Sequence, residues 1–144
     1  MNLTGRWKGK YTLGIGYRRA LAGKSEPFEF ELNDNNGIIK GVCFDKIVNA
    51  IEGNESTILG TFDNGLLSFK KTYKYHPGYD EKGSSILMEN VKTDGVDYVG
   101  HIRKKLFSKD IYFEGEWQIN VEFKDDFGNI HKSSSGGTWK MRKI

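Results

Sequence analysis

The stretch that decides the fold is Ile111–Phe123, which reads IYFEGEWQINVEF. Apolar residues or glycine occupy every odd position, and polar side chains fill the even positions after Tyr112. Alternate residues of a β-strand point to opposite faces, so this stretch predicts a long strand with one face toward a core.

Shorter alternations of the same kind recur along the chain, each bounded by residues that favour turns. They predict further strands at Leu3–Leu13, Phe28–Leu32, Ile38–Phe44, Ser56–Phe62, Leu66–Tyr75, Val96–Arg103 and Gly137–Arg142, with a less regular one at Ile86–Val91. The segments Asn33–Gly37 and Asp63–Gly65 are rich in residues that tolerate a positive φ, as hairpin turns require. Short connections between consecutive strands indicate an antiparallel meander.

Glycine recurs inside these strands, in the register of the apolar side chains. The pattern apolar–x–Gly–x–apolar is centred on Gly5, Gly41, Gly60, Gly100 and Gly115. Glycine weakens a strand unless the backbone must bend or approach another chain segment closely, and a sheet that coils into a barrel needs such points. We therefore predict an all-β fold: one antiparallel up-and-down barrel of about eight to ten strands over residues 1–144.

Composition supports this fold and excludes several classes of function. The 144 residues include 18 glycines, 9 Phe, 7 Tyr and 3 Trp, a composition typical of strands and turns. Cys43 is the single cysteine, which excludes disulfides within the chain and multi-cysteine metal sites and favours a cytoplasmic setting. No apolar run is long enough to span a bilayer, so we expect no membrane partner. A net charge of +3 is low for a dedicated nucleic-acid binder.

The opening segment Leu3-Thr4-Gly5-Arg6-Trp7 resembles the first strand of lipocalins and of avidins. Both families belong to the calycin group of up-and-down barrels, together with fatty-acid-binding proteins. The resemblance implies a lipocalin-like barrel that holds its ligand inside. It also implies that a basic residue of the closing strand packs across Trp7, and Arg142 or Lys140 is placed to do so.

Aromatic side chains with polar groups dominate the positions predicted to face inward, and such residues often line small-molecule pockets. The candidate ligand-binding residues are Trp7, Tyr11, Phe30, Phe62, Lys71, Tyr73, Tyr98, Trp117 and Trp139. Lys71 is the only charge in the inward series of its strand, where it can pair with an anionic head group. Alternatively, the aromatic residues fill the barrel and Lys71 lies at its rim.

Other motifs predict no chemistry of their own. The histidines are not grouped as metal ligands would be, and Cys43 lacks a histidine–carboxylate partner, so we expect no metal, no cofactor and no catalytic residue. Basic residues interleave with aromatic ones at Lys70–Lys74 and lie beside them at Arg103–Lys105, as on single-stranded nucleic-acid surfaces. Because most of the aromatic residues fall on the inward face, we do not expect a nucleic-acid partner.

Three functions remain open from the sequence. The first is non-enzymatic binding of a small, partly apolar or amphipathic ligand, with or without an anionic group, inside the barrel. The second is a solid barrel that binds a protein partner through the long connections Ile15–Glu26 and His76–Ser85. The third is an enzyme that uses the barrel cavity. Clustering of inward polar groups around Lys71 would favour this third function.

Overall fold

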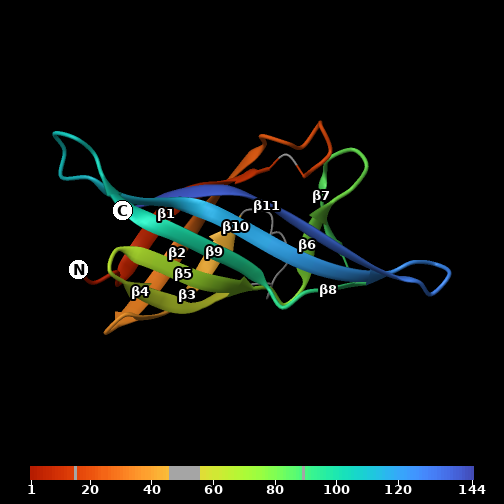
Figure 1. The fold of residues 1–144 in the computed structure, drawn as a ribbon, viewed down its shortest axis with the longest axis horizontal. Helices are drawn as coiled ribbons and strands as arrows, with labels where there is room; N and C mark the ends of the chain where they lie inside the picture. Colours follow the sequence, from red (N-terminus) through yellow and green to blue (C-terminus); the bar gives the residue numbers. More distant parts are fainter. Residues whose placement is uncertain (15, 46–55, 89) are drawn as a thin grey trace.

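Eight antiparallel strands close into a barrel in the computed structural model, which describes residues 1–14, 16–45, 56–88 and 90–144. The barrel strands are β1 (Gly5–Leu13), β2 (Ser25–Asn35), β3 (Ile38–Asp45), β4 (Ser56–Asp63), β5 (Leu66–Thr72), β9 (Val96–Lys104), β10 (Ile111–Lys124) and β11 (Ile130–Lys143). Closure occurs because β1 pairs with both β2 and β11 (Figure 1). The predicted all-β, up-and-down barrel is confirmed.

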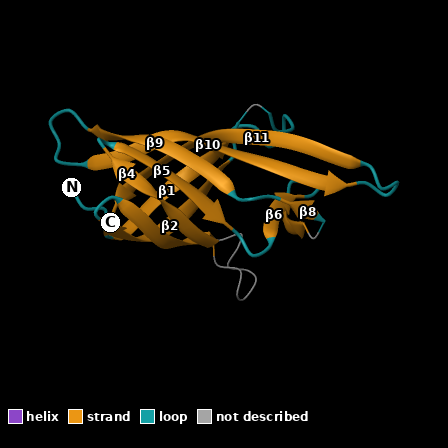
Figure 2. Cartoon of the chain, turned by 60° about the horizontal axis from the view of Figure 1, so that its bottom comes forward, coloured by secondary structure: helices purple, strands orange, loops and turns teal. Residues whose placement is uncertain are grey.

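Three short strands lie beyond one end of the barrel (Figures 1 and 2). Strands β6 (His76–Tyr79) and β7 (Ser85–Met88) form a separate two-stranded sheet, and β8 (Val91–Lys92) pairs only with the far part of β10. The connection predicted at His76–Ser85 therefore contains a strand. The strand predicted at Ile86–Val91 is divided between β7 and β8, and its residue 89 lies outside the described residues.

Strand β11 is much longer than the predicted Gly137–Arg142. It begins at Ile130 and pairs with β10 from there to Arg142, including Ser135 opposite Ile119. The serine and glycine residues in its first half do not alternate with apolar residues. The side-chain pattern therefore could not reveal this part of the strand, which is defined by main-chain pairing with β10. Most of the predicted connection Asp45–Glu55 falls outside the described residues. The residues that the structure describes, taken over the whole chain, form no helix, and hence no helix able to cross a membrane.

The inward glycines allow neighbouring strands to approach closely. A Cβ atom added at Gly115 would lie 1.9 Å from the carbonyl oxygen of Val99 on β9, and one added at Gly100 would lie 2.4 Å from the Trp139 ring. These two glycines face each other in the β9–β10 pair. Strong coiling at this point therefore depends on the absence of both side chains.

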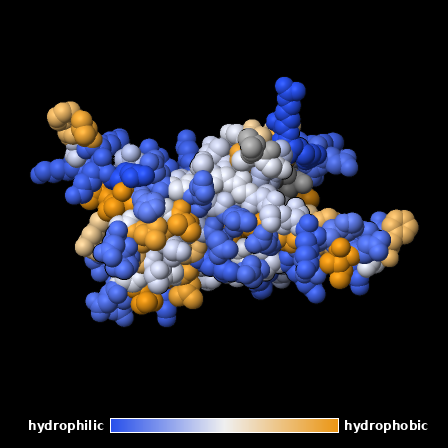
Figure 3. Space-filling view, viewed as in Figure 1, coloured by the Kyte–Doolittle hydropathy of each residue, from blue (hydrophilic) through white to orange (hydrophobic). Residues whose placement is uncertain are grey.

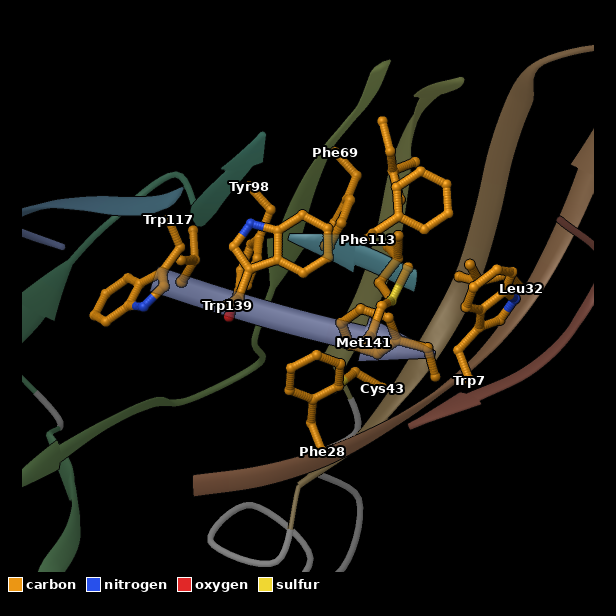
Figure 4. Packing of buried hydrophobic residues seen from close by; sticks show 14 of the residues in the cluster. Trp7, Phe28, Leu32, Cys43, Phe69, Tyr98, Phe113, Trp117, Trp139 and Met141 are labelled. Atoms are coloured by element: carbon orange, nitrogen blue, oxygen red, sulfur yellow. The ribbon is translucent and has the colours of Figure 1, made fainter. Parts of the chain in front are cut away.

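Aromatic side chains fill the half of the barrel that contains both chain termini, which we call the closed half (Figures 1 and 4). The Trp7 and Phe113 rings lie 5.5 Å apart, and Phe69 makes ring contacts with Phe30 and Trp139 at 5.5 and 5.7 Å. The Trp7–Phe113 pair is tilted and the other two pack edge to face. Such aromatic pairs add about 0.5–1.5 kcal/mol each to the burial of apolar area. The closed half is a solid core.

A lysine packs across Trp7, but it is neither of the two residues expected. The Lys143 Nζ atom lies 5.9 Å from the centroid of the Trp7 ring, and the two residues are directly opposed in the β1–β11 pair. Lys140 and Arg142 belong to the other register of β11, so they point away from the barrel interior. Lys140 instead lies over the outer ring of Tyr112, at 4.2 Å.

Candidate functional site

A cavity of about 450 Å³ occupies the end of the barrel opposite the closed half. Its walls come from the last residues of β1 and β5, the first residues of β9, and the middle of β10 and β11. The segment after β1 and the β6–β7 sheet cover it. The residues that line it are Tyr11, Leu13, Gly16, Tyr17, Arg18, Leu21, Lys71, Tyr73, His76, Gly78, Asp80, Glu81, Met88, Val96, Tyr98, Trp117, Ile119, Val121, Ser133, Ser134 and Ser135.

Lys71 is the central charged group of this cavity. It follows Leu67 and Phe69 in the inward register of β5 and is only 1% exposed. Its Nζ atom lies 5.4, 4.9 and 5.2 Å from the ring centroids of Tyr11, Tyr73 and Tyr98. A cation at these distances is stabilised by the ring quadrupoles, by up to about 2 kcal/mol when it is desolvated. The strand thus places an ammonium group among three phenol rings inside the barrel.

Trp117 forms the apolar wall beside this group. Its ring lies 6.0 Å from that of Tyr11 and 6.1 Å from that of Tyr17. The indole Nε1 donates a hydrogen bond to the carbonyl oxygen of Thr12 at 3.1 Å. Because its only donor is satisfied by the backbone, Trp117 presents an apolar surface to the cavity.

Tyr17 and His76 add polar groups that the sequence did not identify. Ser135 Oγ donates to the Tyr17 hydroxyl at 3.1 Å, and burial raises the pKa of that hydroxyl, so it stays a neutral phenol. The His76 Nδ1 atom is buried and has no hydrogen-bond partner among the described residues. Burial lowers the pKa of His76, which favours the neutral imidazole. A buried polar atom without a partner is costly to leave in that state, and a ligand can satisfy it.

Arg18 holds the cover of the cavity together. Its guanidinium donates to the backbone carbonyl oxygens of Asp80 and Glu81. Asp80 in turn accepts the backbone N–H groups of Lys82 and Ser84 at 2.9 and 2.8 Å. Two segments far apart in sequence therefore meet over the cavity, and no periodic pattern in either segment could have shown this.

Five of the nine predicted ligand-binding residues line the cavity together: Tyr11, Lys71, Tyr73, Tyr98 and Trp117. The other four do not reach it. Trp7, Phe30 and Trp139 are buried in the core, and Phe62 packs against Phe113 at 5.6 Å. These four share the inward register, but register alone does not tell how far along the barrel a residue lies.

No family model matches the sequence, and a search of curated proteins finds no match. Within the described ranges, no group of three or more His, Cys, Asp or Glu side chains could hold a metal ion. The function must therefore be argued from the cavity itself.

Proposed function

We propose that the protein binds a small amphipathic anion, without catalysis, in the cavity around Lys71. The observation that carries this proposal is an ammonium group 1% exposed, surrounded by three tyrosine rings and facing a cavity of about 450 Å³. Pockets for small ligands commonly span about 300–1,000 Å³ and combine apolar walls with a few polar groups.

The distribution of side chains indicates a ligand with a polar head and an apolar tail. Lys71 and the tyrosines offer a charge and hydroxyl groups to a carboxylate or similar head group. Leu13, Leu21 and Ile119 offer apolar contacts to the tail. The carboxylates of Asp80 and Glu81 on the cover disfavour a second negative charge at the other end of the ligand.

A calycin-like relationship is part of this proposal. It is supported by the closed eight-stranded meander, by the Gly5-x-Trp7 start of β1 and by Lys143 packed across Trp7. A ligand held inside the barrel is what that relationship implies. The single cysteine, Cys43, which is buried, supports the proposed cytoplasmic setting.

Matched anionic and neutral ligands test the proposal. We expect decanoate to bind with a Kd on the order of micromolar and decanol, of equal chain length, to bind more weakly. Ligand that binds only the folded state raises the melting temperature, and calorimetric titration gives the affinity directly. If neither ligand shifts the melting temperature, the binding proposal fails and a solid interaction barrel becomes the better account.

The variant Lys71→Met makes the test specific. We expect it to weaken decanoate binding by about tenfold or more while leaving decanol binding nearly unchanged, because only the head-group contact is lost. Lys40→Met removes an exposed lysine from β3 and is the matched control. Equal losses for the two ligands would show that Lys71 does not recognise the head group. The preference of the unaltered protein for decanoate tests the same point without a variant.

A further inference from the structure

The connection between β9 and β10 presents two apolar side chains to solvent. Leu106 is 83% exposed and Phe107 is 101% exposed, and together we call them the apolar tip. The connection that carries them is the projection at the upper left of Figures 1 and 3, at the closed end of the barrel, and orange atoms lie on it. Side-chain and backbone hydrogen bonds order this connection, including Asp110 N–H to Ser108 Oγ at 3.0 Å. An ordered turn therefore holds both apolar side chains in solvent, where their exposure is unfavourable.

Cations surround the apolar tip. Lys104 is the last residue of β9, and Lys105 and Lys109 lie in the connection itself. Four more lie on the adjacent outer surface of β1 and β11: Lys8, Lys10, Lys140 and Arg142. These four and Lys105 line one surface groove of about 720 Å³. We call the seven cations the basic face, and all of them are exposed.

The basic face is arranged at some cost to the fold. Lys8 lies directly opposite Arg142, and Lys10 directly opposite Lys140, in the β1–β11 pair. Like charges directly opposed across two strands are destabilising. In the part of the chain that the structure describes, no carboxylate forms an ion pair with any of the seven cations.

The nearby acidic groups neutralise only part of this charge. Glu29 and Asp110 line the same groove. Glu29 lies directly opposite Lys8 in the β1–β2 pair, and Glu114 directly opposite Lys140 in the β10–β11 pair. Glu29 forms an ion pair with Arg6 at 2.8 Å, and Glu114 forms one with Arg103 at 3.2 Å. The face therefore keeps a strong positive charge on a chain whose net charge is only +3.

We propose that the apolar tip and the basic face together dock the protein on an anionic lipid bilayer. The tip enters the boundary between head groups and acyl chains, while the cations contact lipid phosphates and carboxylates. This proposal differs from the sequence-based expectation of no membrane partner. That expectation rested on the lack of a segment long enough to span a bilayer, and a protein that binds the bilayer surface needs no such segment. The apolar tip lies at the opposite end of the barrel from the cavity, and the basic face lies on the outer wall while the cavity lies inside, so each proposal can fail alone.

A bilayer suits these residues better than a nucleic acid does. Three aromatic residues line the groove: Phe28, Phe44 and Tyr112. Phe28 is buried and Lys140 lies across the Tyr112 ring at 4.2 Å, so of these three only Phe44, at 37% exposed, offers a ring on which a base could stack. Leu106 and Phe107 do not line the groove, and the connection that carries them projects from the end of the barrel. An apolar tip that projects from the end of the barrel can insert into the surface of a bilayer.

The molecule contains its own control. Phe127 is 90% exposed and lies at the turn between β10 and β11, which projects on the right of Figures 1 and 3. Its neighbours Asp125 and Asp126 are acidic. Phe107 and Phe127 thus match in exposure and differ in the charge around them.

Co-sedimentation with vesicles tests the proposal. We expect the full chain to bind vesicles of phosphatidylcholine mixed with phosphatidylserine, not those of phosphatidylcholine alone, and to release as salt is raised. The double variants Leu106→Ser/Phe107→Ser and Lys8→Ser/Lys140→Ser should each weaken binding by about tenfold or more. Phe127→Ser should have no effect. Melting temperature and decanoate binding establish that each variant is folded.

Tryptophan emission locates the inserted residue. In Phe107→Trp we expect a blue shift on addition of the mixed vesicles, and in Phe127→Trp no shift, because only the first ring enters an apolar medium. Equal binding to both vesicle types, or a shift at position 127 alone, would overturn the proposal. Tighter binding to a single-stranded oligonucleotide than to the mixed vesicles, or tip-dependent dimerisation without lipid, would also overturn it and assign the face to that partner.

Discussion

The two halves of the barrel are built on the same strands, yet one is solid and the other hollow. Along β5 the inward side chain changes from Phe69 in the closed half to Lys71 at the cavity. Along β11 it changes from Met141 to Ser135. In both cases an apolar core residue gives way to one that carries a charge or a hydroxyl. A continuous meander can therefore supply a core and a polar cavity in succession, by changing residues within one register.

The largest expected effect lies in the closed half. Phe113→Ala should lower the free energy of unfolding by about 3–5 kcal/mol, because it leaves a void between Trp7 and Phe62 that the solid core cannot fill. Tyr73→Ala, at the already hollow end, should cost far less. Urea unfolding of both variants measures the difference. Equal losses would show that the two halves are packed alike.

A smaller effect is expected where β9 and β10 approach each other. Gly115→Ala should cost about 1–3 kcal/mol, since its Cβ would lie 1.9 Å from the Val99 carbonyl oxygen and the strands must separate. The control is Gly16→Ala at the cavity cover, where no atom of the described residues, its chain neighbours apart, lies within 4 Å of the added carbon. Thermal unfolding compares the two, and a Gly115→Ala protein as stable as the control would refute the close approach.

The smallest effect concerns the pH dependence of the cavity half. Because burial lowers the pKa of His76, the unfolded chain takes up a proton at higher pH than the folded protein does. Stability should therefore be full above about pH 6.5 and fall as the pH decreases below it. His76→Gln should reduce this fall, and His101→Gln, on the exposed outer surface, should leave it unchanged. Urea midpoints measured across this range test the prediction, which fails if both variants match the unaltered protein.

The sequence was sufficient for the barrel because strand alternation and inward glycines report on local geometry. It also identified Lys71, since one charge in an apolar register is visible without a structure. It could not separate Trp117 from Trp7 and Trp139, which share the inward register but differ in depth along the barrel. Depth is set by the stagger of paired strands, which leaves no local pattern.

The cover of the cavity was missed for a related reason. Tyr17 and Arg18 lie in an irregular segment, and His76 begins a short strand whose partner is another short strand. Their positions depend on contacts between segments about sixty residues apart, such as Arg18 with the Asp80 carbonyl. The basic residue that packs over Trp7 is Lys143, the residue after the expected Arg142, because Lys143 and not Arg142 shares the inward register.

The three indole N–H groups give the most direct test of a solid half and a ligand-binding half in one barrel. Each donates to a backbone carbonyl: Trp7 to Leu3, Trp117 to Thr12, and Trp139 to Glu116. Trp117 and Trp7 lie at opposite ends of the row of core side chains (Figure 4). In an NMR titration with decanoate, the Trp117 indole resonance should shift most and the Trp7 resonance should stay in place. A shift at Trp7 as large as that at Trp117, or no shift at any indole, would contradict the account.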